Sequence, residues 1–161
     1  MRHKIPAGVA LALAALLIPA PAMAQAGPLS LTTAVTCPAV VVYKDVRTLI
    51  TIDLDTATDT EVRVLAAQIL TVANANPLPV LRGALQTQLN GTPDQLRAFL
   101  KGSVQNAWKT DLRIAIARTL TTAGPYVQAA AQATLDAPGI DAYLAYLNDG
   151  LFVARARDCV I

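Results

Sequence analysis

The chain has 161 residues, of which 54% are hydrophobic and 15% are charged, and its formal net charge is +2 at pH 7. Its basic residues are scattered singly along the sequence. This pattern argues against a nucleic-acid-binding protein, which carries basic residues gathered on one face. The length suits one domain with a single hydrophobic core.

Residues 1–24 are predicted to be a cleaved Sec-type signal peptide. A positively charged start precedes an apolar run over residues 7–18, and two prolines then lead to small residues. Such a segment allows cleavage after Ala24 or after Ala26. The apolar run is shorter than the roughly 20 residues that span a membrane, so we expect no stable anchor after cleavage. The mature protein is therefore expected to be secreted, either extracellular or associated with the cell wall.

Removal of this segment takes Arg2 and Lys4 with it, which leaves 11 basic and 11 acidic residues and a net charge near zero. The two cysteines of the chain, Cys37 and Cys159, lie near opposite ends of the mature protein. In an oxidising compartment such a pair is predicted to form a disulfide, although two unpaired thiols are the alternative. The sequence indicates no metal site and no cofactor.

Residues 25–58 are predicted to be a linker and capping segment, in which the structure of residues 35–56 is ambiguous. Their many β-branched residues and the alternation over Ile50–Leu54 favour a strand. A helix is also possible because several apolar residues fit one helix face. Those residues are Val42, Val46, Leu49 and Leu54. We favour the helix, as an atypical partial repeat that covers the exposed end of a helical stack.

The rest of the chain has clear helix boundaries. Thr58 and Thr92 each begin a four-residue pattern typical of a capping box. Pro77 ends the first predicted helix, because proline disfavours helical geometry in the residue before it. Gly91 follows the end of the second predicted helix, where glycine is a common stop signal. Apolar residues at helical spacing fill the segments between these boundaries.

The sequence also repeats itself. Residues 94–111 recur as residues 141–158, with matching apolar positions and an offset of 47 residues. A self-similar period of this length is typical of stacked helical units. The prediction is an all-α, right-handed-type stack of about two repeats over residues 59–158. Each repeat is expected to contain two longer helices and one short helix.

The order of features in each copy resembles the short ALF repeats of exported actinobacterial proteins. The pattern is an aspartate followed closely by an arginine (Asp-x-Arg in the second copy), an apolar stripe ending in Leu, a Gly/Pro break, an Ala-rich helix and a helix ending near Gly. In the first copy these features are carried by Asp59, Arg63, Leu70, Ala84, Leu89, Phe99, Leu100 and Gly102. The resemblance implies no established activity. Related repeats occur as helical interaction segments in secreted and toxin-type proteins.

Catalysis is not expected. The one histidine, His3, leaves with the signal peptide, so the mature chain has no histidine for a general base or a triad. Three aspartates are matched or nearly matched between the copies, namely Asp59, Asp111 and Asp158. We place each of them before or at the start of its own helix, where a carboxylate stabilises the positive end of the helix dipole. We therefore predict a non-enzymatic protein.

Four aromatic residues are the candidates for binding a protein partner, namely Trp108, Tyr126, Tyr143 and Tyr146. Tryptophan and tyrosine are enriched at interface hot spots. Trp108 lies in a polar connector where helical periodicity does not require it, although an ordinary core position is the competing interpretation. On the binding hypothesis, Trp108→Ala keeps the helices but loses the partner. A second hypothesis, from the high Ala and Leu content, is an extracellular carrier of a small apolar ligand.

Overall fold

The computed structural model describes residues 41–137 and 139–159, which lie in one compact unit spanning Val35–Ile161. These described residues are mostly helical and contain no strand. The all-α class predicted from the sequence is therefore confirmed. The predicted signal peptide and Cys37 lie outside the described residues, so cleavage, export and the disulfide stay predictions.

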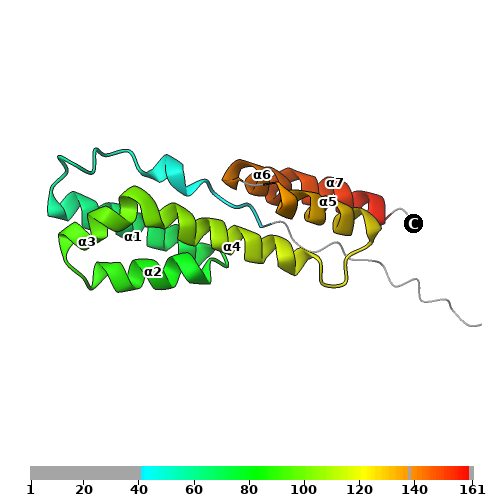
Figure 1. Ribbon diagram of the computed structural model, residues 1–161, viewed down its shortest axis with the longest axis horizontal. Coiled ribbons are helices and arrows are strands. Elements are labelled where there is room, and N and C mark those ends of the chain that lie inside the picture. The colour runs from blue at the N-terminus through cyan, green and yellow to red at the C-terminus, as the bar shows by residue number, and fades with distance from the viewer. Residues whose placement is uncertain (1–40, 138, 160–161) are drawn as a thin grey trace, which may run out of the picture. The chain divides into compact units, whose positions relative to one another are not determined.

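Seven α-helices follow one another in the described chain, and Figure 1 shows their arrangement. They are α1 (Asp59–Ala75), α2 (Pro79–Leu89), α3 (Pro93–Ala98), α4 (Val104–Thr119), α5 (Pro125–Asp136), α6 (Ile140–Ala145) and α7 (Leu151–Asp158). The π-helical turn η2 (Phe99–Ser103) joins α3 to α4 without a break, and η3 (Tyr146–Gly150) joins α6 to α7 in the same way. The short helix of each copy is thus continuous with the long helix after it, which corrects the prediction of a separate short helix.

The helix ends follow the boundary signals of the sequence. The Thr58 hydroxyl accepts a hydrogen bond from the Glu61 amide at 3.3 Å, and the Glu61 carboxylate accepts one from the Thr58 amide at 2.8 Å. The hydrogen bond from the Thr58 side chain also holds the pKa of Glu61 below its usual value. Thr92 and Gln95 repeat this reciprocal pair at the start of α3. Both capping boxes are therefore confirmed, and they fix where α1 and α3 begin.

The core lies between the helices of each copy. Helix α2 packs on α1 and α4, and α5 packs on α4 and α7. The largest fully buried side chains include Ile69, Leu81, Leu85, Leu96, Leu100, Trp108, Leu112, Ile116 and Leu147. Each such aliphatic side chain contributes roughly 1.5–3 kcal/mol by leaving water. Buried alanines on α1, α4 and α5 let the neighbouring helices approach closely.

Residues 41–58, here called the strap, form neither the helix that we favoured nor the alternative strand. They contain one short 3-10 helix, η1 (Val46–Leu49), within otherwise irregular backbone. Tyr43, Val46 and Leu54 are nevertheless buried in the core. The strap does not simply cover the end of the stack, because it bonds to the second copy through Asn148 and to the first copy through Lys101.

Candidate functional site

Two of the matched aspartates cap helices that are not their own. Asp111 lies inside α4 and is fully buried, and its carboxylate accepts hydrogen bonds from the amides of Val80 at 3.0 Å and Leu81 at 2.7 Å. These amides belong to the first turn of α2, whose own N-cap residue, Leu78, makes no side-chain cap bond. Asp111 therefore supplies the missing cap from a neighbouring helix.

Asp158 repeats the arrangement in the second copy. Its carboxylate accepts hydrogen bonds from the amides of Tyr126 at 2.9 Å and Val127 at 3.0 Å, in the first turn of α5. The residue before this turn is Gly124, where a Cβ atom would lie 2.4 Å from the Asp158 carboxyl carbon. The predicted structural role at a helix start is supported, and Asp59 begins its own helix α1 as predicted. The predicted position is wrong for Asp111 and Asp158, because each carboxylate lies inside or at the end of one helix and caps another.

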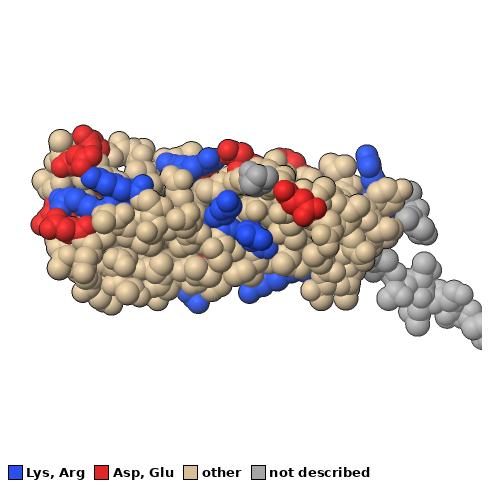
Figure 2. Space-filling view, in the orientation of Figure 1, with Lys and Arg blue, Asp and Glu red and all other residues tan. Residues whose placement is uncertain are grey.

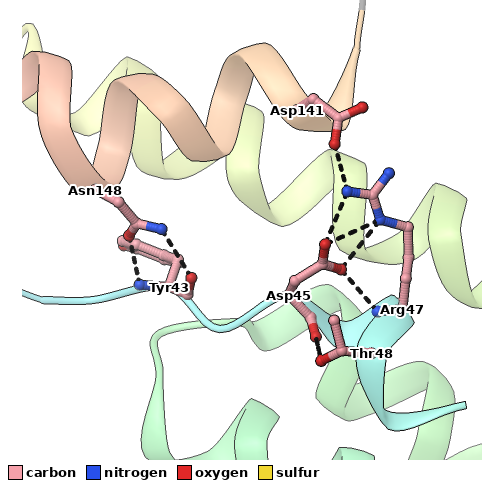
Figure 3. Close-up of polar contacts among 6 residues, drawn as sticks. All are labelled: Tyr43, Asp45, Arg47, Thr48, Asp141 and Asn148. Atoms are coloured by element: carbon pink, nitrogen blue, oxygen red, sulfur yellow. Dashed lines mark hydrogen bonds and ion pairs between the residues drawn. The ribbon is translucent and has the colours of Figure 1, made fainter.

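The π turns hold the strap, as Figure 3 shows for the second copy. The Asn148 side chain, in η3, accepts a hydrogen bond from the Tyr43 amide at 2.8 Å and donates one to the Tyr43 carbonyl at 3.0 Å. Lys101 occupies the corresponding place in η2 and forms an ion pair with Asp55 of the strap. A π turn inserts one residue into the helical repeat and changes the direction of the side chains around it.

Arg47 of the strap also joins the strap to the second copy. Arg47 contacts the carboxylate of Asp45 at 2.8 Å and also pairs with Asp141 at the start of α6 (Figure 3). The hydrogen bond from Arg47 lowers the pKa of both carboxyl groups below their usual values. Both ion pairs are partly open to water, so each contributes little energy alone.

Three of the four candidate partner-binding residues are buried, which agrees with the core interpretation of Trp108 and leaves Tyr143 and Tyr146 without an accessible surface for a partner. Trp108 is fully buried on α4, and Tyr143 and Tyr146 are exposed by only 2% and 4%. Trp108 is a core residue because α4 begins before the connector in which we placed it, so that its position faces the strap and not solvent. Arg47 lies over its ring at 6.0 Å from the centroid. Tyr126 alone of the four stays accessible, at 45%.

The buried aromatic residues differ in how their polar atoms are used. The Tyr146 hydroxyl shares a 2.8 Å hydrogen bond with the Thr119 hydroxyl, and burial raises the pKa of Tyr146. The Trp108 indole nitrogen is buried without a hydrogen-bond partner among the described atoms. A buried donor left in this way costs about 1–3 kcal/mol. No local sequence pattern indicates this difference, because it depends on neighbours far along the chain.

A half-open hollow of about 200 Å³ lies where the strap meets α4 and α7. The strap contributes Tyr43, α4 contributes Arg118, and α7 contributes Leu151 and Arg155. Neither arginine forms an ion pair within the part of the chain that the structure describes. We call this feature the two-arginine hollow. The sequence does not reveal this hollow, because the strap, Pro77, α4 and α7 that line it are far apart in the chain.

Two further kinds of feature, a membrane-spanning helix and a metal-binding cluster, were sought among the described residues. No helix among residues 41–137 and 139–159 is long and apolar enough to cross a membrane. Within the same residues, no group of three or more histidine, cysteine, aspartate or glutamate side chains is placed to hold a metal ion. Cys159 is exposed after the end of α7.

Among the comparisons with known proteins, only the one with protein-family models found a match, and that match lies within the repeat. Neither the curated proteins nor the solved structures gave a significant match to the chain. The resemblance to ALF repeats is confirmed within the second copy, over the end of α4, the elements α5, α6 and η3, and the start of α7. Residues 113–154 match the ALF family model, described as short repeats of unknown function.

Proposed function

We propose that the mature chain is a secreted, non-enzymatic helical-repeat module that binds a protein partner outside the membrane or at the cell wall. The observation that carries the proposal is a pair of exposed apolar residues at the same place in both copies. Val80 is 37% exposed and Tyr126 is 45% exposed, and each follows the proline that begins its helix. A core does not need these side chains, so their repetition supports a role in contact.

The two capping carboxylates support the same proposal by fixing these positions. Asp111 and Asp158 bind the backbone amides of Val80 and Tyr126, so the side chains of both residues stand on anchored backbone. Preorganised contact residues lose less entropy on binding. Arg157 lies over the Tyr126 ring at 5.8 Å, and tyrosine with arginine is a frequent combination at interface hot spots.

The composition of the surface is consistent with such a module. Figure 2 shows charged side chains in separate small groups, with wide uncharged areas between them on the visible face. Depletion of charge is typical of the centre of protein interfaces. The absence of histidine from the predicted mature sequence supports a non-enzymatic role.

The test is a quantitative pull-down from culture supernatant and cell-wall extract with the mature protein. The double variant Val80→Ala/Tyr126→Ala is expected to lose a protein that the unmodified chain enriches, while its circular dichroism and melting temperature stay unchanged. Val64→Ala is the matched control, because Val64 is 52% exposed on α1 but is not repeated in this way. Equal enrichment by the double variant would show that these residues do not form the contact.

The second candidate, a carrier of a small apolar ligand, has weaker support. The two-arginine hollow contains two guanidinium groups, and a second hollow is lined by Gln88, Gln95 and Ser103 as well as Phe99. Both are open to solvent, whereas a purely apolar ligand favours an enclosed apolar cavity. Their chemistry favours a ligand that carries polar groups.

A further inference from the structure

We propose that the two-arginine hollow binds a small organic anion, a carboxylate attached to one aromatic ring or a short alkyl chain. The hollow joins apolar and cationic walls in one place. Leu147, Leu151 and Phe152 supply apolar surface, while Arg118 and Arg155 approach from α4 and from α7. This combination fits a ligand with an apolar body and a negative end. The proposal does not depend on a protein partner.

The positive charge of the hollow is not neutralised by the described chain. Arg118 and Arg155 have no ion pair there. Asp158, three residues after Arg155, is occupied by two amides of α5, and Asp111, on the same helix as Arg118, is occupied by two amides of α2. Because these carboxylates are held by their capping roles, both guanidinium groups stay available to an incoming anion.

The charge of Arg118 reaches a wall residue of the hollow, and the charge of Arg155 reaches a residue beside it. Burial raises the pKa of Tyr43, the charge of Arg118 opposes that rise, and the charge of Asp111 adds to it. Burial likewise raises the pKa of Tyr146, which precedes the lining residue Leu147, against the opposing effects of the Thr119 hydrogen bond and the charge of Arg155. The two cations therefore stabilise negative charge next to a partly buried surface, where screening by water is reduced.

Size and geometry narrow the ligand class. The volume of about 200 Å³ is somewhat larger than a cavity of about 150 Å³ that accepts benzene. One ring with a short carboxylate arm fits this space, and a long acyl chain does not. Guanidinium groups bind carboxylates through two parallel hydrogen bonds, so the charged end of the ligand is expected to lie between or beside the arginines.

The probe for the test is 3-phenylpropionate, titrated into the mature full chain and followed by calorimetry and by amide chemical shifts. Its neutral counterpart, 3-phenylpropan-1-ol, has the same ring and arm without the charge. We expect the acid to bind at least tenfold more tightly than the alcohol, and the shifted amides to surround Leu151 and Ala115, which line the hollow. Equal affinity for acid and alcohol, or no binding of the acid, would overturn the proposal.

Single variants distinguish a specific effect of Arg118 and Arg155 on binding of the acid from an effect of the overall charge of the protein. Arg118→Gln and Arg155→Gln are each expected to weaken binding of the acid by fivefold or more and to leave binding of the alcohol unchanged. Arg113→Gln is the matched control, because Arg113 is an exposed arginine of α4 that does not line the hollow. An equal loss in this control would refute a specific site. Tyr126→Ala is expected to keep binding the acid, which distinguishes this site from the proposed partner surface.

Discussion

At the scale of single residues, the repeated aspartates are the most informative feature. Proline at the start of α2 and of α5 favours the helix but leaves the next amides without a cap. Asp111 and Asp158 supply that cap from a helix that is about 30 residues further along the chain. A local hydrogen bond is thus replaced by one that also holds two helices together.

The stability of the protein should depend unequally on these caps. Asp111→Ala is expected to lower the free energy of unfolding by about 2–3 kcal/mol, because it leaves the buried amide of Leu81 and the partly buried amide of Val80 without their acceptor. Asp158→Ala is expected to cost about 1 kcal/mol, since its site is partly exposed. Asp94→Ala is the control, with an expected change within about 0.5 kcal/mol. Urea denaturation measures all three, and equal losses for Asp94 and Asp111 would contradict the capping role.

Trp108 is a second single residue on which the stability of the protein should depend. Trp108→Ala is expected to lower the free energy of unfolding by about 3–5 kcal/mol, because it empties a fully buried site under the strap. Trp108→Phe keeps a ring there and removes the unpartnered indole nitrogen, so it should cost much less. The measurement is thermal unfolding followed by circular dichroism. Similar melting temperatures for Trp108→Ala and the unmodified protein would contradict the core role of Trp108 and favour the partner-contact hypothesis.

At the scale of elements, the sequence predicted what short-range chemistry determines. The capping boxes at Thr58 and Thr92 and the proline break at Pro77 place the ends of α1 and the start of α3 correctly. The π turns were not predictable from these signals, because their glycines, Gly102 and Gly150, indicate the end of a helix, whereas the helical backbone continues through both. The strap was not predictable either, since its backbone is held by Asn148, 105 residues away.

The attachment of the strap should weaken in acid. Arg47 lowers the pKa of Asp45 and Asp141 below the ordinary value of 3.8. Groups with a lowered folded pKa stabilise the fold above the ordinary value, and this contribution is lost as the pH falls through the lowered pKa. Arg47→Gln should therefore reduce the melting temperature near pH 7, and the difference from the unmodified protein should shrink as the pH falls below 3.8.

The control for this experiment is Arg82→Gln, because Arg82 forms no ion pair among the described residues. Its difference from the unmodified protein should be small and should not change between pH 7 and pH 3. A pH-independent loss in Arg47→Gln would assign the effect to packing over Trp108 instead of to the two carboxylates.

At the scale of the whole molecule, the predicted export determines the N-terminal residue and the mass expected of the mature protein. The protein recovered from culture medium should begin at Gln25 or Gly27, depending on whether cleavage follows Ala24 or Ala26. Its intact mass should lie about 2 Da below that of the reduced chain if Cys37 and Cys159 are joined. Mass spectrometry before and after reduction measures both. Recovery of the full chain with residue 1 in the cell pellet would contradict the prediction of export.

The continuity of α3 with α4, and of α6 with α7, affects how a repeat can be added to or removed from the chain. Because α3 passes through η2 into α4, the boundary between the copies lies inside a helix and not in a loop. Removal of residues 100–146 would join Phe99 to Leu147 at equivalent points of the two π turns. Asp158 would then stand where Asp111 stands now, facing the open first turn of α2. The gain or loss of one 47-residue repeat therefore keeps the helix continuous across the junction. Each added repeat also brings an aspartate that caps a helix of the repeat before it.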